Sequence, residues 1–237
     1  MNLISSTHRS VLAILFLLFF NMIPLATTQS ASDSPPSLKV AFVVTNGANV
    51  IDLAGAWEVF QDTMFDDASG HHMPFELFTV SQSTKPVAMT GGLHVVPSHT
   101  FSDAPHPDIV VVGAQAGAPG LREWLRARAG DSRVVMSVCT GAFKLADAGL
   151  LDGKKATTHH DYLDNFAKKF PKVNLQRGPR FVQADDVIYT AGGLTSGVDL
   201  ALHIVEKFYG RTIADRTAAY MEYQRWSAPK ATTAAVP

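Results

Sequence analysis

Cys139 is the only cysteine of the 237-residue chain, and it stands between an apolar run and a helical pattern. The apolar run of residues 134–138 predicts a buried strand, and the Thr-Gly-Ala-Phe segment after the cysteine predicts a sharp turn into a helix. Such a turn lifts a nucleophile above the sheet, and the N–H groups at the helix start lower the pKa of a thiol. The pattern therefore favours a nucleophilic cysteine about as much as a buried, inert one.

Polar residues at the ends of other predicted strands can assist such a cysteine. Asp52 starts the first predicted helix, where it either exchanges a proton with the thiol or serves as an ordinary helix N-cap. The backbone N–H groups of Thr140 and of Ala114 or Gln115 can stabilise a developing negative charge. The latter two belong to a loop that begins at Gly113, and a flexible turn is the alternative interpretation of that loop.

His159 and His160 follow a short predicted strand over residues 155–158 and are candidates for a Cys–His pair. Adjacent strand residues point to opposite faces, so at most one of them faces Cys139, and we prefer His159. A hydrogen-bonded structural histidine is the alternative. The other histidines lack metal-ligand spacing, and the Gly-Gly-Leu-Thr-Ser-Gly segment from Gly192 matches no nucleotide-binding fingerprint. We therefore expect no metal and no cofactor, and we interpret that segment as tight strand-to-helix packing.

Composition limits the partners and the location of the protein. The 20 Lys and Arg against 21 Asp and Glu give a net charge of -1, so no surface for nucleic acid is indicated, and we expect a small-molecule substrate. Residues 1–30, with an apolar core over 11–20, predict a secretory signal peptide and a periplasmic or secreted protein. An uncleaved anchor is the alternative, but the core is short for a membrane span, so we expect no stable membrane insertion. Residues 31–37 are a spacer and residues 227–237 a flexible tail.

The mature chain predicts a single α/β domain over residues 38–226. The alternation of strands and helices is typical of a doubly wound, mostly parallel sheet between helical layers, whose ligands lie beyond the carboxyl ends of the strands. The expected strands are residues 38–45, 75–81, 107–113 and 133–138. Residues 86–97 are expected to form a hairpin or two short strands, and residues 181–190 a hairpin. The expected helices are residues 51–64, 120–129, 161–170, 195–209 and 213–225, together with one that follows Cys139 and stops at Gly149.

Four motifs resemble the DJ-1/PfpI superfamily of class I glutamine-amidotransferase-like domains. They are Ser-Val-Cys-Thr-Gly-Ala-Phe (137–143), Ala-Thr-Thr-His (156–159), Ile-Asp-Leu-Ala-Gly (51–55) and Gly-Gly-Leu-Thr-Ser-Gly-Val-Asp (192–199). More narrowly, they are similar to the branch that contains isonitrile hydratase and the N-terminal domains of AraC-type regulators. The resemblance implies a flavodoxin-like sandwich that is usually a homodimer.

The resemblance also implies a set of site residues, and the sequence departs from the family pattern at two places. In the hydratase, the cysteine, the threonine after it and the aspartate of the first loop belong to the site, which corresponds here to Cys139, Thr140 and Asp52. The loop that is usually Pro-Gly-Gly reads Gly113-Ala114-Gln115, so the charge-stabilising loop is altered. Thr140 stands where PfpI proteases often have a histidine, so we do not expect a peptidase.

The sequence thus predicts a secreted, cysteine-dependent hydratase or hydrolase of a small carbon–nitrogen substrate similar to an isonitrile. The alternative is a non-catalytic periplasmic ligand-binding protein, or a redox or stress-response protein in which Cys139 oxidises reversibly. Only a short Ala/Thr/Pro-rich tail follows the last predicted helix, so we expect no helix-turn-helix pair and no binding to DNA.

Overall fold

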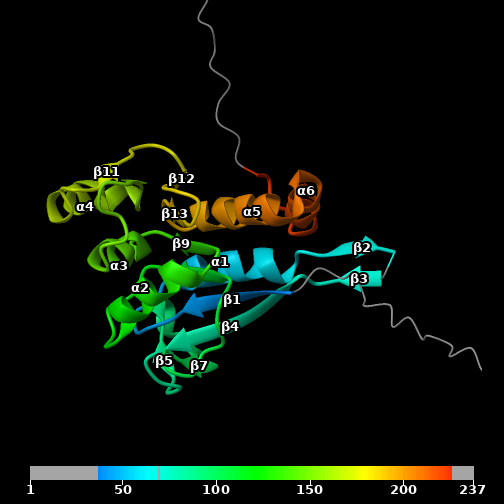
Figure 1. The fold of residues 1–237 in the computed structure, drawn as a ribbon, viewed down its shortest axis with the longest axis horizontal. Coiled ribbons are helices and arrows are strands. Elements are labelled where there is room, and N and C mark those ends of the chain that lie inside the picture. Colours follow the sequence, from blue (N-terminus) through cyan, green and yellow to red (C-terminus); the bar gives the residue numbers. More distant parts are fainter. Residues whose placement is uncertain (1–36, 69, 226–237) are drawn as a thin grey trace, which may run out of the picture. The chain divides into compact units, whose positions relative to one another are not determined.

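One seven-stranded sheet forms the centre of the fold (Figure 1). The computed structural model describes residues 37–68 and 70–225; the predicted signal peptide (1–30) and tail (227–237) lie outside them. The strands are β1 (Leu38–Val43), β2 (Phe65–Asp67), β3 (Gly70–His72), β4 (Phe75–Ser81), β5 (Val87–Ala88), β6 (His94–Val95), β7 (His99–Thr100), β8 (Ile109–Val112), β9 (Val134–Ser137), β10 (Lys155–Ala156), β11 (Asn174–Leu175), β12 (Phe181–Gln183) and β13 (Ile188–Ala191). The α-helices are α1 (Val50–Gln61), α2 (Leu121–Asp131), α3 (Gly141–Asp147), α4 (Leu163–Lys169), α5 (Ser196–Tyr209) and α6 (Arg211–Tyr220), and the 3-10 helices are η1 (Thr90–Gly92) and η2 (His160–Tyr162).

The strand order is β12-β13-β9-β8-β1-β4-β7, and the only antiparallel pair in this sheet is β12 with β13. β8 and β9 are buried along their whole length, as expected for central parallel strands that are covered on both faces. The prediction of a doubly wound, mostly parallel sheet in a single domain is confirmed.

The register of the central strands brings three loops to one edge of the sheet. Val43, the last residue of β1, pairs with Val112 of β8, which in turn pairs with Ser137 of β9. Because the strands are parallel, their carboxyl ends lie side by side. The segment after β1 leads to Asp52 in the first turn of α1, the segment after β8 is the loop from Gly113, and the segment after β9 contains Cys139.

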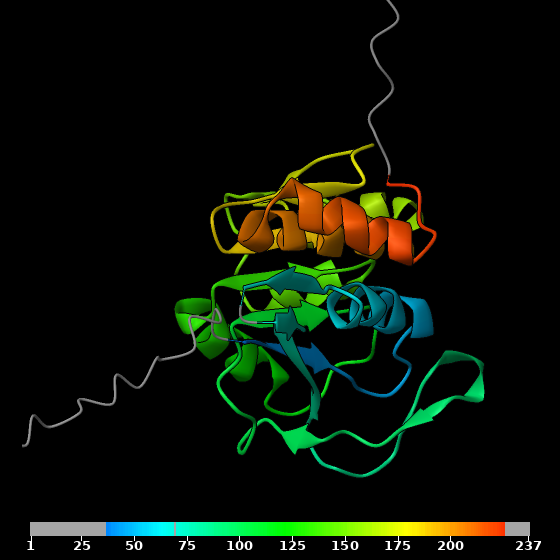
Figure 2. The same ribbon diagram turned by 90° about the vertical axis from the view of Figure 1, so that its right-hand side faces the viewer.

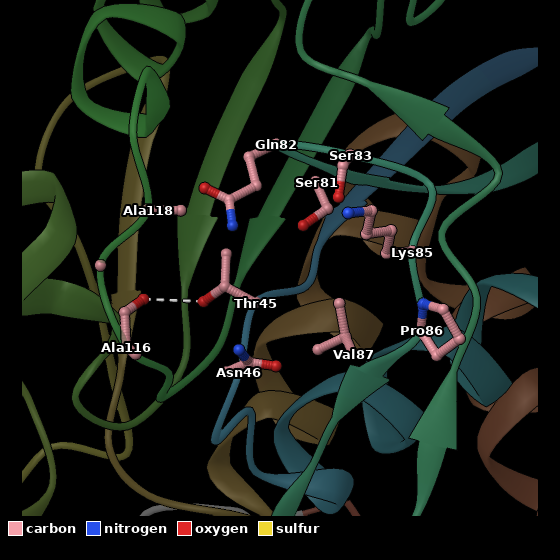
Figure 3. A pocket seen from close by; sticks show the side chains of 11 residues that line it. Thr45, Asn46, Ser81, Gln82, Ser83, Lys85, Pro86, Val87, Ala116 and Ala118 are labelled. Atoms are coloured by element: carbon pink, nitrogen blue, oxygen red, sulfur yellow. Dashed lines mark hydrogen bonds between the residues drawn. The ribbon is translucent and has the colours of Figure 1, made fainter.

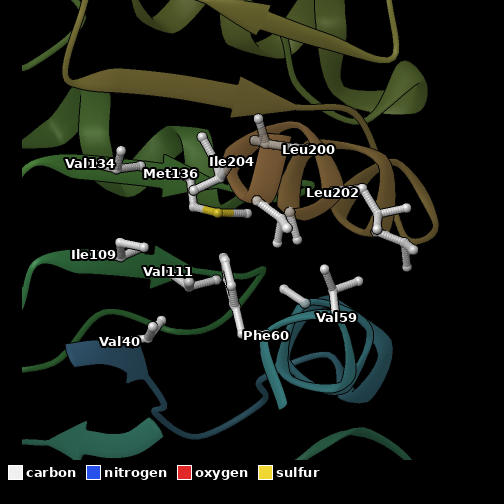
Figure 4. Close-up of a cluster of buried hydrophobic side chains, with 14 of the residues drawn as sticks. Val40, Val59, Phe60, Ile109, Val111, Val134, Met136, Leu200, Leu202 and Ile204 are labelled. Carbon is white, nitrogen blue, oxygen red and sulfur yellow. The ribbon is translucent and has the colours of Figure 1, made fainter. Parts of the chain in front are cut away.

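Helices cover both faces of the sheet. On one face, Phe60 of α1 and Ile204 of α5 lie in one buried cluster with Met136, and α6 contributes to the same cluster (Figure 4). On the other face, Leu125 of α2, Leu145 of α3 and Phe166 of α4 form the second cluster. Figure 2 shows α5 and α6 together on one side of the sheet. Among the described residues, no helix combines the length and the apolar character needed to cross a membrane.

Four features differ from the sequence-based expectation. β2 and β3 pair antiparallel, and the Asp66 and Asp67 carboxylates pair with His71 and His72 across the two strands. The strand expected over 155–158 shortens to β10, which pairs with β11 outside the main sheet. Residues 161–170 form η2 followed by α4, and the last helix ends at Tyr220. The two expected hairpins are confirmed as β5–β6 and β12–β13.

Candidate active site

Cys139 occupies a strained turn between β9 and α3. Its φ of 59° lies in the left-handed region, which non-glycine residues rarely adopt. The turn is held because the Cys139 N–H donates to the Gly192 carbonyl at 2.8 Å and its carbonyl accepts from the Thr158 hydroxyl at 2.9 Å. A Cβ at Gly141 would lie 2.0 Å from the Val112 carbonyl oxygen, so only glycine lets α3 start this close to β8. These residues form the expected nucleophile elbow.

Asp52 faces the same edge of the sheet from α1 and is 1% exposed. Its Oδ2 accepts a hydrogen bond from the Ala114 N–H at 2.9 Å. The N-cap of α1 is Asn49, whose side chain accepts from the Ile51 N–H at 3.2 Å. The alternative that Asp52 is an ordinary N-cap is therefore wrong. A Cβ at Gly113 would lie 2.8 Å from the Asp52 Cβ, so the loop can approach Asp52 only with glycine at that position.

The Asp52 carboxyl and the Cys139 thiol control each other's protonation. Burial raises the pKa of Asp52, although the Ala114 N–H, the thiol, the Leu194 N–H and the charge of His159 act to lower it. Burial, followed by the negative charge of Asp52, raises the pKa of Cys139 to about 12. The expectation that the helix start lowers the thiol pKa is thus wrong, because desolvation and a neighbouring carboxylate outweigh the N–H groups of a short helix.

One oxygen of the Asp52 carboxyl is left with capacity to accept a proton. Its Oδ1 is buried and has no partner of standard hydrogen-bond geometry among the described residues. The thiol and the Leu194 N–H still act on the carboxyl, so their contacts with it are looser than the Ala114 bond. The thiol, whose pKa is about 12, holds its proton at neutral pH beside an Asp52 oxygen that can accept it.

Two backbone N–H groups point at the sulfur. Those of Thr140 and Leu194 act as hydrogen-bond donors that lower the thiol pKa against the larger effects of burial and charge. Leu194 reaches this position with a φ of 54°, a second left-handed non-glycine residue beside the site. We interpreted the segment from Gly192 as tight packing. This interpretation agrees with Gly193, where a Cβ would lie 2.1 Å from the His159 ring, but it did not identify the Leu194 N–H as a donor to the site. No side-chain pattern in the sequence marks this donor.

The loop from Gly113 to Gln115 contacts Asp52 and the first strand, whereas we predicted that its N–H groups would stabilise a developing negative charge. The Ala114 N–H is bonded to Asp52, so it is engaged by the carboxylate and the expected charge-stabilising role passes to the Thr140 and Leu194 N–H groups. The Gln115 side chain turns to the first strand, where its Oε1 accepts from the Thr45 N–H at 2.7 Å. The Thr140 side chain lines a neighbouring cavity of about 200 Å³.

His159 acts on Asp52 rather than on the thiol. His159 is among the groups that influence the Asp52 pKa, whereas the groups that act on Cys139 are Asp52 and the two N–H groups. The predicted Cys–His pair is therefore replaced by a Cys–Asp pair. His159 stacks on the exposed His160 with ring centroids 4.3 Å apart, and its Nδ1 accepts from the Asp161 N–H at 3.2 Å.

The same histidines form the one metal-compatible group in residues 37–68 and 70–225. One ligand atom from each of His159, His160 and Asp161 lies within 4.8 Å of the others. No regular ligand motif marks these three consecutive residues in the sequence. Two of the three are exposed, so the group lies at the surface and not in the Asp52–Cys139 site.

The family model of the DJ-1/PfpI family matches residues 38–207, and this range contains every residue of the site. The chain belongs to the DJ-1/PfpI family. A relative named isonitrile hydratase, from Pseudomonas putida, is 32% identical over 193 residues, which make up 79% of this chain and 79% of the hydratase. The suspected branch of the DJ-1/PfpI family is thereby supported.

Other members of the DJ-1/PfpI family differ in kind. The HTH-type transcriptional regulator GbdR of Pseudomonas aeruginosa is 28% identical over 194 residues, and the match covers 78% of this chain and 51% of GbdR. The chain therefore spans about half the length of that regulator. Among solved structures, a THiJ/PfpI family protein from Pseudomonas syringae matches with a TM-score of 0.68 and 25% identity, covering 91% of this chain and 87% of that chain.

Proposed function

We propose that this DJ-1/PfpI protein is a cysteine-dependent enzyme that adds water to an isonitrile and releases a formamide. The observation that carries the proposal is the buried pair of Asp52 and Cys139, with the Thr140 and Leu194 N–H groups directed at the sulfur. Such a pair combines a nucleophile, a proton carrier and charge-stabilising donors in one place. The 32% identity to an isonitrile hydratase supports the same reaction.

In the first half of the reaction, the thiol adds across the terminal carbon of the isonitrile. The sulfur of Cys139 forms a bond to that carbon while its proton passes to Asp52. Asp52 then delivers the proton to the same carbon, which gives a thioimidate with a carbon–nitrogen double bond. A thiol with a pKa of about 12 suits this step, because Asp52 removes the proton only as the bond to the substrate forms.

In the second half, water resolves the thioimidate. Asp52, again a carboxylate, takes a proton from water as its oxygen bonds to the substrate carbon. The nitrogen accepts a proton from Asp52, the carbon–sulfur bond breaks, and the remaining water proton returns to the sulfur. The product is a formamide, and both side chains regain their starting protonation states. The N–H groups of Thr140 and Leu194 stabilise the sulfur when it carries negative charge.

An apolar side chain beside the pair favours a small apolar substrate. Leu194, whose N–H acts on both Asp52 and Cys139, is 42% exposed. Large exposed apolar side chains next to a buried polar pair are typical of a substrate site. An isonitrile with a hydrocarbon substituent matches this combination.

The test is turnover of cyclohexyl isonitrile by the purified protein, followed by NMR as loss of isonitrile and gain of formamide. We expect Cys139→Ala to abolish turnover and Asp52→Asn to reduce it about 10²-fold or more. Asp152→Asn is the matched control, since this exposed carboxylate pairs only with Lys172 at 3.3 Å among the contacts of the described residues. Turnover by the Cys139→Ala variant would exclude a covalent mechanism.

A non-catalytic ligand-binding protein is the second candidate function. The match to the regulator GbdR and the protonated state of the Cys139 thiol favour it. Binding of an isonitrile without formamide or a covalent adduct would support this candidate over the hydratase. Reversible oxidation of Cys139 is less favoured than either, because oxidation requires thiolate character.

We further propose that the protein is exported and forms a homodimer. The signal-peptide pattern of residues 1–30 supports export, and the mass of the N-terminal peptide from a periplasmic fraction tests it. Three exposed apolar side chains, Ile51, Leu93 and Val96, support a dimer. Residues 48–50 and Thr90 are hydrogen bonded, which connects the two segments that carry these side chains. Sedimentation of wild type against Val96→Lys tests the interface.

A further inference from the structure

A second cavity, of about 300 Å³, lies at the same edge of the sheet but is not lined by Asp52 or Cys139 (Figure 3). Its walls come from the ends of β1 and β4 and from residues 116–118 of the loop after β8. The carboxyl ends of parallel strands are where α/β sheets bind ligands. The loop after β8 is a shared wall, because its Ala114 N–H holds Asp52 on the other side.

The floor of this cavity is built from buried hydroxyl groups. Thr45 is 3% exposed, and its hydroxyl donates to the Ala116 carbonyl at 2.7 Å, the bond drawn in Figure 3. Its N–H donates to the Gln115 Oε1 at 2.7 Å, which fixes the floor to the loop. Ser81 also lines the cavity; the residue is 2% exposed, and none of the described residues forms a hydrogen bond with its hydroxyl. This hydroxyl is therefore available to donate to, or accept from, a ligand in the cavity.

The upper wall supplies donors and one positive charge. Gln82, Ser83 and Lys85 follow β4, and in Figure 3 the Lys85 amino group points toward the Ser81 and Ser83 side chains. Asn46 uses its Oδ1 to accept from the Ala88 N–H at 3.2 Å, which leaves its amide N–H groups to donate. Within the described residues, Lys85 has no carboxylate partner, and the walls of the cavity include no Asp or Glu.

These groups define the chemistry of a ligand. One unpaired ammonium group favours a single negative charge, and several hydroxyl and amide donors favour oxygen atoms around it. The walls offer no carboxylate for a ligand cation. The volume suits a molecule of a few carbon atoms. We propose that this cavity is a second binding site, which takes a small hydroxycarboxylate with its carboxylate on Lys85 and its hydroxyl groups on Ser81 and Asn46.

Isothermal titration of the purified full-length chain with glycerate tests this site, with glyceramide as the uncharged counterpart. We expect saturable binding of glycerate and roughly tenfold weaker binding of glyceramide, because the charge-assisted contact to Lys85 is lost. Lys85→Met removes an exposed charge without affecting the core, and we expect it to weaken glycerate binding about tenfold or more. Ser81→Ala, which removes a hydroxyl that has no partner in the folded chain, is expected to weaken it several-fold while the protein stays folded.

Two controls assign the binding to this cavity. Lys168→Met changes an exposed lysine on α4 and is expected to leave the glycerate affinity within about twofold of wild type. Cys139→Ala is expected to bind glycerate like wild type, so this result is independent of isonitrile turnover. Absence of saturable binding, equal affinity in the Lys85→Met variant, or loss of binding on substitution of Cys139 would each overturn the proposal.

Discussion

Replacement of Asp52 by asparagine should lower the pKa of the Cys139 thiol. The wild-type value of about 12 has burial as its largest cause and the Asp52 charge as its second. At about pH 8, four units below that value, ionising the thiol costs about 5 kcal/mol, and only about one thiol in 10⁴ is a thiolate. The variant keeps the burial but loses the negative charge. Its midpoint should therefore fall while remaining above that of a free cysteine, and each unit of fall raises the thiolate population about tenfold.

The ultraviolet absorbance of the thiolate, recorded through an alkaline titration, measures this midpoint. Cys139 is the only cysteine, so subtraction of the Cys139→Ala titration leaves its signal alone. Asp152→Asn, which removes an exposed carboxylate, should titrate like wild type. A midpoint in the Asp52→Asn variant that equals or exceeds the wild-type midpoint would refute the reasoning, because Asp52 would then not be the charge that keeps the thiol protonated.

Three further predictions follow from the contacts of the site and its supports. Gly113→Ala should lower kcat/KM for the isonitrile about 10²-fold by displacing Asp52, whereas Gly117→Ala, whose Cβ meets nothing within 4 Å in the same loop, should retain activity in the same assay. Arg180→Met should lower the free energy of unfolding in urea by about 3–5 kcal/mol, because its carboxylate partner Asp199 is 4% exposed. Lys172→Met breaks an exposed ion pair and should lower the free energy of unfolding by less than about 1 kcal/mol. The folded-state pKa of the thiol is raised from 9.0 to about 12, so the contribution of the thiol to stability is present below pH 9.0 and is lost as the pH rises toward 12. Cys139→Ala should remove this alkaline decline in the free energy of unfolding, which amounts to up to about 1.4 kcal/mol per pH unit. An unchanged decline in urea titrations of the variant would contradict the assigned thiol pKa.

The pairing of Asp52 with Cys139 could be predicted from the sequence because both residues follow strands whose apolar runs are unbroken. Such runs belong to the middle of a parallel sheet, and the ends of central parallel strands must meet at one edge. The register of Val43, Val112 and Ser137 realises that expectation. The left-handed turn at Cys139 was also foreseeable, since the glycine two residues later leaves room for α3 against β8.

The donors and the sign of the thiol pKa shift were not predictable in the same way. A backbone N–H such as that of Leu194 leaves no side-chain signature, and the strained conformation falls on a leucine where a glycine would have been the usual signal. The sequence locates the start of α3 but not the amount of water removed around the sulfur. That amount decides the direction of the shift, because desolvation opposes the favourable N–H groups and is the larger effect.

The protonated state of Cys139 has a practical consequence for surveys of reactive cysteines. Chemical probes that select hyperreactive thiols respond to the thiolate, so they would pass over a sulfur whose pKa is about 12. A proteome-wide inventory made with such reagents would class this residue as inert. A reagent with a basic carbon, which accepts the proton as it reacts, would be needed to reveal it.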